Sequence, residues 1–438
     1  MKPDALRATY ADLTALIETG AAGPLSPQDE ERLAEALGRA AQLWDFTAIT
    51  HAFDRLEAAG AVKVDESASP ALRAAYAAHV GARLRLVPFE AGYTLLRGAL
   101  DRLPDEPALL RLQALYLWQE APDQLVRLHR QGMAGLTPAS GAVYGEVLGR
   151  IGMKDRALQL PAVAPLDRAV RLDMLLLGVN VLEDRNRRLS WLNAHLEARG
   201  LTPLALSGPE AAFGIDTLEP AADPAPGLPG GPGGEDSPKV SVVMCAYDAA
   251  PFVERAALSI LGQGYPNIEL ICVDDGSTDD TGKILARLAK RDKRVAVQRL
   301  PKNEGTYVAR NAGLKAATGE FVTFHDADDW AHPDRIGREL AQMLAEPDLV
   351  AVNSAWVRMD GEGRILLREH GRYGDPAPAA VMLRRAPVLE RVGMFAPHRV
   401  GADSEYRQRL QTAFGMKRWK ADPTVLTFGR SHPGSLTQ

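Results

Sequence analysis

The sequence predicts two domains of different fold class, an all-helical, repeat-like N-terminal domain and a C-terminal α/β domain, and three observations carry this prediction. The first half of the chain places apolar residues at helical spacing with almost no strand signal. From Lys239 onward, short β-rich runs alternate with helical segments, as in layered α/β folds. Between the two, EPAADPAPGLPGGPGGEDSP is too rich in Pro and Gly for a helix or a central strand. We therefore expect a helical domain at 1–205, a linker at 206–238 and an α/β domain at 239–438.

Length and composition bound the class of protein. With 438 residues, 46% of them hydrophobic, the chain exceeds one ordinary domain and can bury real cores. A net charge of −5 gives no sign of a nucleic-acid partner. Cys245 and Cys272 lie in apolar runs, which indicates buried thiols in a reducing compartment. No apolar run approaches the ~20 residues of a membrane span, and no signal peptide is visible, so we expect a cytoplasmic protein and leave open a peripheral contact with the inner face of the membrane.

The helical domain is predicted from amphipathic segments separated by breakers. DEERLAEALGRAAQLW and FTAITHAFDRLEAAG place apolar residues three and four apart, which gives each helix one buried stripe. GYTLLRGALDRLPDEPALLRLQALYLW and GEVLGRIGMKDRALQL resemble junctions between tetratricopeptide repeats, although no strict period of about 34 residues survives. A stack of helix pairs either presents a concave surface to a protein partner or only packs against the second domain, and both alternatives stay open.

The elements expected in the α/β domain follow one another at short intervals. KVSVVMCAY at 239–247 is predicted as a strand, and a helix to about residue 262 follows. IELICVDDGS contains a second strand, 268–273, and a helix to about residue 290 comes next. Polar residues follow several of these strands, and ligands of open α/β sheets bind beyond the carboxyl ends of the strands, so we expect one crevice there. The further expected elements are a strand at 295–299, a helix at 306–317 and a strand at 321–324.

Three carboxylates follow the last of these strands, in GEFVTFHDADDW. Burying the charges of Asp326, Asp328 and Asp329 unpaired would be costly, so we expect them at the strand exit, facing solvent, a cation or a ligand. Asp326 and Asp328 form a DxD pair whose oxygen atoms suit Mn²⁺ or Mg²⁺ carrying a diphosphate. The alternative is a turn in which Asp329 or Asp334 caps the next helix.

Taken together, these segments resemble one protein family. KVSVVMCAYDAAPFVERAALSILGQGYPNIELICVDDGSTDDT, followed by NEGTYVARNAGLKAATGEFVTFHDADDWAHPDRI, is similar to the nucleotide-binding half of family 2 glycosyltransferases. The resemblance covers about 239–438 and rests on several motifs that agree in order and spacing. It implies the GT-A fold, a Rossmann-like mixed sheet, and an enzyme that moves a sugar from a nucleotide-sugar donor to a separate acceptor.

The resemblance implies roles at the nucleotide. Tyr247 matches the position that lies against the base, and its ring suits stacking on uracil. Asp275 matches the carboxylate that accepts a hydrogen from the imide nitrogen of the base, which favours a UDP-sugar, and Asp274 is either ribose-facing or structural. Arg310 matches an arginine near the nucleotide, with a pair to Asp275 as the alternative. Asp326 would face the hydroxyls of the ribose or the donor sugar.

The same resemblance implies a divalent metal ion, Mn²⁺ or Mg²⁺, on the diphosphate. Asp328 is the expected metal ligand. In FGRSHPGSLTQ near the end of the chain, His432 would complete the metal or diphosphate site, and Arg430 would clamp a phosphate. The alternative for His432 is an exposed residue of a frayed tail.

The catalytic base is implied by GADSEYRQRL at 401–410, which matches the acidic motif of the family at the start of a helix. The family usually has Glu-Asp there, and this chain has Ala402 before Asp403. Asp403 would remove the proton from the acceptor hydroxyl as that oxygen attacks the anomeric carbon, and Glu405 is the second choice. The alternative for Asp403 is a helix N-cap.

The resemblance extends to the outcome of the reaction. One displacement with one base inverts the anomeric carbon, as in this family. Arg418 and Trp419 lack the glutamine of the QxxRW motif of processive synthases, so we expect transfer of one or a few sugars to a glycan, lipid-linked or protein acceptor in cell-surface polysaccharide biosynthesis. Two rivals stay open: a scaffold protein with a catalytically idle transferase fold, and a nucleotidyltransferase.

Overall fold

The structure is a computed structural model that describes most of the chain in two compact units. One unit comprises Met1–Leu166 with Glu369–Gly371, and the other comprises Asp167–Arg368 with Arg372–Gln438. We call them the helical unit and the sheet unit. The described residues are 3–42, 46–104, 106–120, 141–163, 168–222, 237–368, 372–398 and 401–432.

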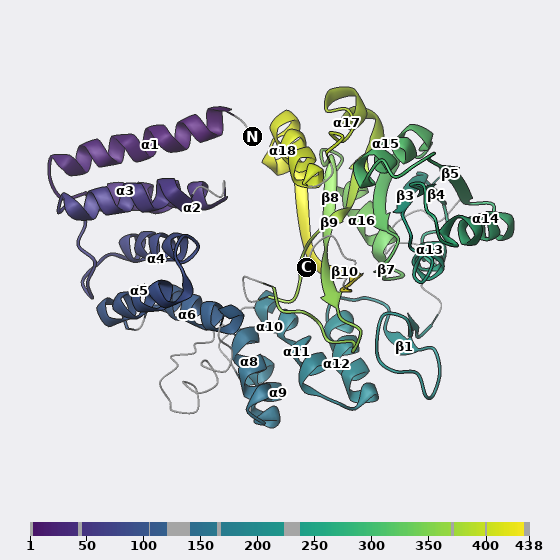
Figure 1. Ribbon diagram of the computed structural model, residues 1–438, viewed down its shortest axis with the longest axis horizontal. Coiled ribbons are helices and arrows are strands. Elements are labelled where there is room, and N and C mark those ends of the chain that lie inside the picture. The colour runs from purple at the N-terminus through teal and green to yellow at the C-terminus, as the bar shows by residue number, and fades with distance from the viewer. Residues whose placement is uncertain are drawn as a thin grey trace. The chain divides into compact units, whose positions relative to one another are not determined.

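The helical unit confirms the predicted all-helical class. Its helices are stacked in successive layers from α1 to α6 (Figure 1). Local signals set the helix ends, as at the start of α4. There Ser69 accepts a hydrogen bond from the amide of Leu72 at 3.1 Å, and Pro70 is the first residue of the helix. Whether the helices are repeats stays a prediction. The helices are α1 (Pro3–Ala21), α2 (Pro27–Gln42), α3 (Phe46–Ala58), α4 (Pro70–Leu84), α5 (Phe89–Arg102), α6 (Pro107–Glu120), α8 (Gly141–Arg150) and α9 (Lys154–Val163).

An eight-stranded mixed sheet forms the centre of the sheet unit, as the predicted fold class requires. The strand order is β5-β4-β3-β6-β9-β8-β10-β7, and β3 to β6 pair in parallel, while β9 runs antiparallel to both of its neighbours. The strands are β3 (Val240–Ala246), β4 (Ile268–Asp274), β5 (Val295–Arg299), β6 (Phe321–Asp326), β7 (Trp330–Ala331), β8 (Ala351–Met359), β9 (Asp375–Arg384) and β10 (Trp419–Arg430).

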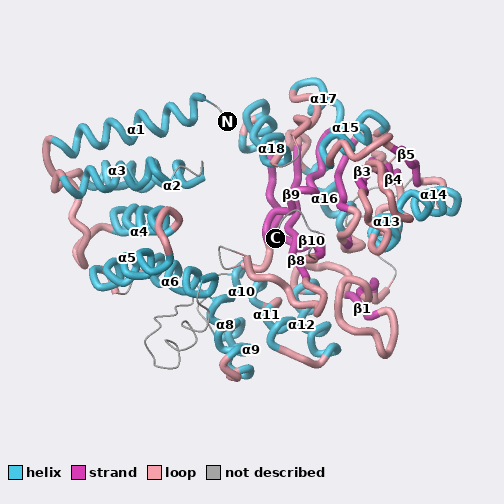
Figure 2. The backbone as a smooth tube through the Cα atoms, in the orientation of Figure 1, coloured by secondary structure: helices cyan, strands magenta, loops and turns pink. Residues whose placement is uncertain are grey.

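Helices cover both faces of this sheet (Figure 2), because its central strands are apolar on both sides. One buried core contains residues of α13, α14 and α16, and the other contains residues of α15, α17 and α18. The helices are α13 (Val253–Leu261), α14 (Thr281–Arg291), α15 (Thr306–Ala316), α16 (Arg335–Ala345), α17 (Arg385–Arg391) and α18 (Ala402–Phe414). Among the described residues, no helix is long and apolar enough to cross a membrane.

The division between the units differs from the expected boundary at residue 205. The sheet unit begins with α10 (Arg168–Met174), α11 (Leu177–Val181) and α12 (Arg185–Glu197), which the sequence pattern grouped with the helical domain. A hairpin of β1 (Leu204–Leu206) and β2 (Leu218–Pro220) follows, across the start of the stretch predicted as a linker. Residues 223–236 of that stretch lie outside the described residues.

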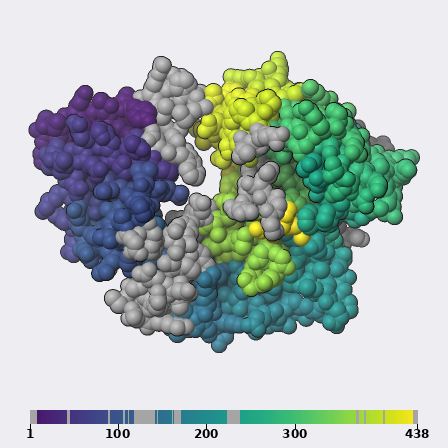
Figure 3. Space-filling view, viewed as in Figure 1, coloured from purple at the N-terminus to yellow at the C-terminus, as the bar shows by residue number. Residues whose placement is uncertain are grey.

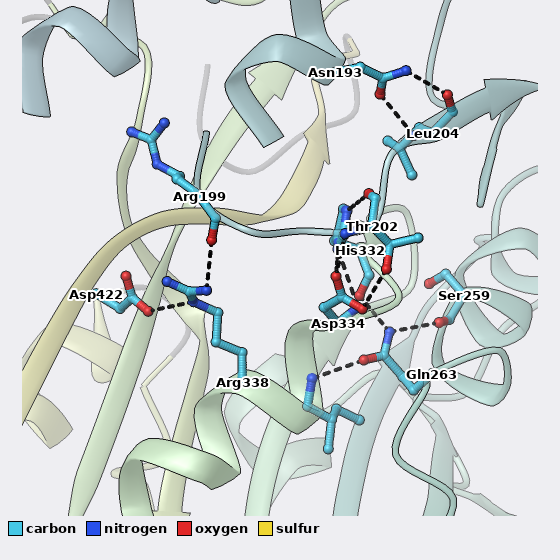
Figure 4. Close-up of polar contacts among 11 residues, drawn as sticks. Asn193, Arg199, Thr202, Leu204, Ser259, Gln263, His332, Asp334, Arg338 and Asp422 are labelled. Atoms are coloured by element: carbon cyan, nitrogen blue, oxygen red, sulfur yellow. Dashed lines mark hydrogen bonds and ion pairs between the residues drawn. The ribbon is translucent and has the colours of Figure 1, made fainter. Parts of the chain in front are cut away.

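Buried contacts explain why this part folds with the sheet. Phe213, Ile215 and Leu218 are buried, although they lie next to a Pro/Gly-rich stretch. The backbone amide and hydroxyl of Thr202 donate to Asp334 at 2.7 and 2.9 Å, and Arg338 donates to the carbonyl of Arg199 at 3.1 Å (Figure 4). We call residues 199–220 the flanking segment. In Figure 3 the teal surface of this region adjoins the green surface of the sheet unit.

The contacts of Asp334 also correct an expectation. Asp334 occupies the N-cap position of α16, but its side chain makes no capping hydrogen bond there. Its carboxylate binds Thr202 instead, and the carbonyl of Thr202 lies 2.9 Å from Nε2 of His332. The acid that the sequence pattern offered as a helix cap therefore joins the flanking segment to the sheet.

Candidate active site

The polar strand ends converge on one edge of the sheet, as predicted. β3 lies between β4 and β6, with Cys245 in register with Asp326 and Ala246 in register with Asp274. The three strands are parallel, so their carboxyl ends lie at the same edge. This edge collects the residues that follow them, including Tyr247, whose side chain is exposed. Ligands of open α/β sheets bind beyond this end of the strands.

Asp326 is held by Arg310. An Nη2 atom of Arg310 lies 2.9 Å from Oδ1 of Asp326, and the arginine side chain is only 6% exposed. Its guanidinium also lies over the rings of Tyr307 and Phe324, at 5.4 and 5.5 Å. The alternative partner considered for Arg310, Asp275, is therefore not the one that the structure provides.

Asp275 organises the loop before α15. Its two carboxylate oxygens accept hydrogen bonds from the amides of Glu304 and Gly305, at 2.8 and 2.9 Å. A carboxylate oxygen has two lone pairs, so these bonds orient the group without exhausting its capacity to accept. Asp275 follows β4, and Tyr247 follows the neighbouring strand β3. The oriented carboxylate and the exposed ring therefore lie at the ends of two paired strands.

Asp274 has a structural environment. It is fully buried, and Oδ1 accepts a hydrogen bond from the amide of Ser277 at 2.9 Å. Oδ2 lies 3.6 Å from Nη1 of Arg299. Of the two alternatives left open by the sequence, the structural one fits these contacts, and the ribose contact stays a prediction.

The structure brings Asp328 and His432 together from distant parts of the chain. Nε2 of His432 lies 3.1 Å from Oδ2 of Asp328, and both side chains are between one quarter and one third exposed. Burial, and then the charge of Asp326, raise the pKa of the Asp328 carboxyl. His432 is therefore held at the sheet edge, and the alternative of a frayed tail residue does not describe it.

This pair fits a divalent metal ion that carries a diphosphate. One carboxylate and one imidazole are suitable ligands, and Mg²⁺ or Mn²⁺ sites at phosphates take most of their ligands from phosphate and water. Burial and the charge of Asp326 raise the pKa of the Asp328 carboxyl, and a bound cation would favour its charged form. Among the described residues, no group of three or more His, Cys, Asp or Glu side chains is arranged to hold a metal ion, so most ligands would come from phosphate and water.

Arg430 has different partners from the expected phosphate. Its Nη1 and Nη2 donate to the carboxylate of Asp216 at 2.9 and 2.6 Å. Its Nε donates to the carbonyl of Asp328 at 3.3 Å, and its guanidinium lies 4.5 Å from the ring centre of Phe252. All three guanidinium nitrogens thus have protein partners, and the contact of Arg430 with a phosphate stays a prediction.

Asp329 anchors the end of β10. It is buried, and Oδ1 accepts a hydrogen bond from the amide of Arg430 at 3.1 Å. Burial, together with the charges of Asp328 and Asp326, raises the pKa of Asp329 well above its ordinary value. The expected capping role of Asp329 is wrong, since the N-cap position of α16 is Asp334.

Asp403 lies in the first turn of α18. The N-cap residue is Gly401, with a left-handed backbone and no side-chain cap, so Asp403 does not cap this helix. Asp403 lines a cavity between α18 and strands β8 to β10, together with Phe395, Tyr406 and Trp419. Glu405 pairs with Arg409 at 2.9 Å, which leaves Asp403 as the better placed acid.

Tyr307 interacts both with Asp403 and with Arg310, the partner of Asp326. Burial, and then the charge of Asp403, raise the pKa of the Tyr307 phenol. The same ring lies under the guanidinium of Arg310, which pairs with Asp326. The acid expected to be the base and the first acid of the DxD pair are therefore linked through Tyr307 and Arg310.

Two residues of this site were not singled out in the sequence. Phe252 contacts both Arg430 and His432, whose ring centre lies 5.1 Å from its own. Asp216 comes from the flanking segment, in the stretch predicted as a linker. No local pattern marks either residue, because both contacts join segments far apart in the chain.

Comparison with known proteins finds similarity to glycosyltransferases. Residues 241–407 match the family model described as Glycosyl transferase family 2. An uncharacterized glycosyltransferase of Haemophilus influenzae is 40% identical over 126 residues, which are 29% of this chain and 50% of that protein. A putative teichuronic acid biosynthesis glycosyltransferase of Bacillus subtilis, TuaG, is 41% identical over 107 residues, 24% of this chain and 42% of that protein. The chain thus spans half or less of the length of these curated relatives.

Two solved structures resemble the chain more weakly. Staphylococcus aureus TarS 1–349 in complex with UDP-GlcNAc is 21% identical, with 45% of this chain and 60% of that chain covered and a TM-score of 0.38. The mannosyltransferase PcManGT from Pyrobaculum calidifontis, in complex with GDP-Man and Mn²⁺, is 19% identical, with 60% and 70% covered and a TM-score of 0.37.

Proposed function

We propose that this chain, which contains a family 2 glycosyltransferase domain at residues 241–407, transfers a sugar from a nucleotide sugar, a UDP-sugar by preference, to the hydroxyl of a separate acceptor. The observation that carries the proposal is the meeting of Asp328 with His432, 3.1 Å apart, beside the Arg310–Asp326 pair at the edge where three parallel strands end. An idle transferase fold has no evident need for this arrangement.

The donor would lie across this edge. Tyr247 would stack on the base, and Asp275, oriented by two backbone amides, would accept the imide hydrogen of uracil. Asp326, held by Arg310, would accept hydrogen bonds from sugar or ribose hydroxyls. Asp328 and His432 would hold a divalent metal ion on the diphosphate, and such an ion supplies charge neutralisation to the departing nucleoside diphosphate.

The protein's own part in the reaction is orientation and proton removal. Asp403 would accept the proton of the acceptor hydroxyl while that oxygen bonds to the anomeric carbon. The bond from the anomeric carbon to the phosphate oxygen breaks, and its electron pair leaves with the nucleoside diphosphate. Attack and departure on opposite sides invert the anomeric carbon. Trp419, a half-buried aromatic residue that lines the cavity at Asp403, would offer an apolar face to an acceptor sugar.

The biological setting is part of the proposal. The name of the TuaG relative refers to teichuronic acid biosynthesis, which supports a role in cell-surface polysaccharide biosynthesis. The acceptor would be a glycan, a lipid-linked glycan or a protein, and the reaction non-processive and cytoplasmic, at the inner face of the membrane where the acceptor requires it. The helical unit would bind a protein partner or the acceptor-carrying assembly.

Calorimetric titration of UDP, GDP and dTDP, with and without Mn²⁺, tests the donor site. We expect Mn²⁺-dependent binding of UDP, which Asp328→Ala abolishes and Asp348→Ala preserves, because Asp348 is 91% exposed. Absence of nucleotide binding in the wild type would contradict the proposal and favour the scaffold alternative. Release of pyrophosphate from a nucleoside triphosphate on incubation with a sugar phosphate would indicate a nucleotidyltransferase.

A further inference from the structure

Asp216 belongs to a segment that precedes the family 2 match, yet its carboxylate reaches the site. It pairs bidentately with Arg430, and the pair joins the β1–β2 hairpin to the end of β10, two residues before His432. We propose that Asp216 is a positioning residue, which holds Arg430 and thereby places His432 and Asp328 for the metal ion. This inference rests on the proposed function.

The loop that carries Asp216 is anchored on both sides. The amide of Ser207 donates to the carbonyl of Thr217 at 2.8 Å, and Arg255 of α13 donates to the carbonyls of Ile215 and Leu218. Ile215, the residue before Asp216, is buried. A side chain on such a supported loop is pre-organised, so it can impose a position on its partner.

The pair differs from an ordinary surface ion pair. Exposed ion pairs contribute little, but the Arg430 side chain is only 12% exposed, although that of Asp216 is 63% exposed. The two parallel hydrogen bonds also define the plane of the guanidinium. Arg430 is thus a largely buried cation, and a carboxylate from the flanking segment helps to orient it.

Arg430 transmits this orientation to the metal ligands through three contacts. Its Nε donates to the carbonyl of Asp328, and its amide donates to Asp329. Its guanidinium packs on the ring of Phe252, and the other contact of that ring is the imidazole of His432. Arg430 therefore contacts Asp328 directly and His432 through the ring of Phe252.

Loss of Asp216 would redirect the cation. Arg430 already contacts the carbonyl of Asp328 and, through its amide, the carboxylate of Asp329, so a pair of its guanidinium with either acid would draw a site residue away from its position. An arginine that neutralises Asp328 competes directly with the metal ion. Groups that orient metal ligands typically change metal affinity by about 10- to 100-fold when they are removed.

The test uses the full chain with the substitution Asp216→Asn. We expect its dissociation constant for Mn²⁺, measured with the metal alone by electron paramagnetic resonance, to rise about 10-fold or more. Glu219→Gln is the matched control, because Glu219 lies in the same hairpin and only approaches Arg255 at 3.9 Å. The control is expected to bind Mn²⁺ as the wild type does.

Hydrogen exchange distinguishes positioning from general stability. The amide of Arg430 donates to Asp329, and the amide of Ser431 donates to the carbonyl of Met359 at 2.9 Å. We expect Asp216→Asn to speed exchange at these two amides, with the amides of β3 and β4 unchanged. The double variant with Arg430→Gln should bind Mn²⁺ no more weakly than Arg430→Gln alone, because both substitutions break the same pair.

The outcomes separate the two proposals. If the wild type binds Mn²⁺ and UDP, and Asp216→Asn binds both equally well with unchanged exchange, the role of Asp216 is contradicted and the glycosyltransferase proposal stands. If the wild type binds no nucleotide, the proposed function fails. In that case the exchange at Arg430 and Ser431 still decides whether Asp216 positions the end of β10, and unchanged exchange overturns the inference.

Discussion

Arg310 and Asp326 form an ion pair of unequal burial, with nitrogen and oxygen 2.9 Å apart and side-chain exposures of 6% and 37%. Arg310 comes from α15 and Asp326 from the end of β6, so the pair joins a helix to the strand that carries the DxD acids. Its asymmetry means that the two partners cannot be removed at equal cost, because water can solvate the free carboxylate but not the free guanidinium.

We therefore predict that Asp326→Asn destabilises the fold more than Arg310→Met. The first variant leaves a buried charge uncompensated, which costs about 3–5 kcal/mol. The second leaves a carboxylate that is in contact with water and loses about 1–3 kcal/mol. Urea unfolding of both variants measures the difference. The double variant should be more stable than Asp326→Asn alone, and equal losses in the two single variants would contradict the argument.

Asp403→Asn should separate catalysis from donor binding. Asp403 lies in the cavity beside α18, away from the contacts that would hold the nucleotide, so the variant should bind UDP and Mn²⁺ as the wild type does. Its transfer rate should fall about 10²- to 10⁴-fold, the usual contribution of a general base. Glu405→Gln serves as control, and because Glu405 pairs with Arg409, it should change the rate far less. A larger loss in Glu405→Gln would reassign the base.

Glu339 should make stability depend on pH. It is fully buried beside Arg335, and burial raises its pKa from the ordinary value of 4.5 to about 7. The folded state therefore binds a proton that the unfolded state has lost between these two values. This contribution to stability is complete below pH 4.5 and is lost as the pH rises to about 7.

Urea unfolding from pH 5 to pH 8 measures this effect in the wild type and in Glu339→Gln. A pKa unit corresponds to about 1.4 kcal/mol, so the wild type should lose up to about 3 kcal/mol relative to the variant over this range. The Ser354 hydroxyl donates a hydrogen bond to Glu339, and the side-chain amide oxygen of the glutamine can accept the same bond. The variant should therefore fold. Parallel pH profiles of the two proteins would show that Glu339 does not titrate in this range.

Two truncated chains test the boundary between the units. A chain that begins at residue 167 retains α10 to α12 and the flanking segment, and we expect it to fold and to unfold cooperatively on heating. A chain that begins at residue 239 loses Thr202, the partner of Asp334, and one of the partners of Arg338, and it uncovers the surface beneath Leu204 and Leu218. We expect this shorter chain to be insoluble or to melt at a lower temperature. Equal melting temperatures would support the boundary expected from the sequence.

Much of the local structure was predictable from the amino-acid pattern. The strand at 295–299 has the predicted bounds, and the helix expected at 306–317 runs from Thr306 to Ala316. The acids after β4 and β6 were expected at strand exits, because charged groups that follow an apolar strand must leave the core. Parallel strands then bring these exits to one edge, so the general place of the site also followed from the pattern.

Partners and boundaries were not predictable in the same way. The pairing of Arg310 with Asp326, the burial of Asp274 and the capture of Arg430 by Asp216 each depend on segments that are far apart in the chain. A hairpin extends into the stretch predicted as a linker, because a few apolar residues there are buried in the sheet unit. Composition alone does not reveal this burial.

Sequence periodicity thus specified the two fold classes, the order of the elements and the types of residue at the strand ends. These properties arise from local rules of spacing, chain direction and the cost of burying charge. Tertiary structure decided which acid each arginine pairs with, which carboxylate is buried, and where the folded unit around the sheet begins. Such choices depend on distances between segments separated by up to 214 residues, and no local pattern encodes them.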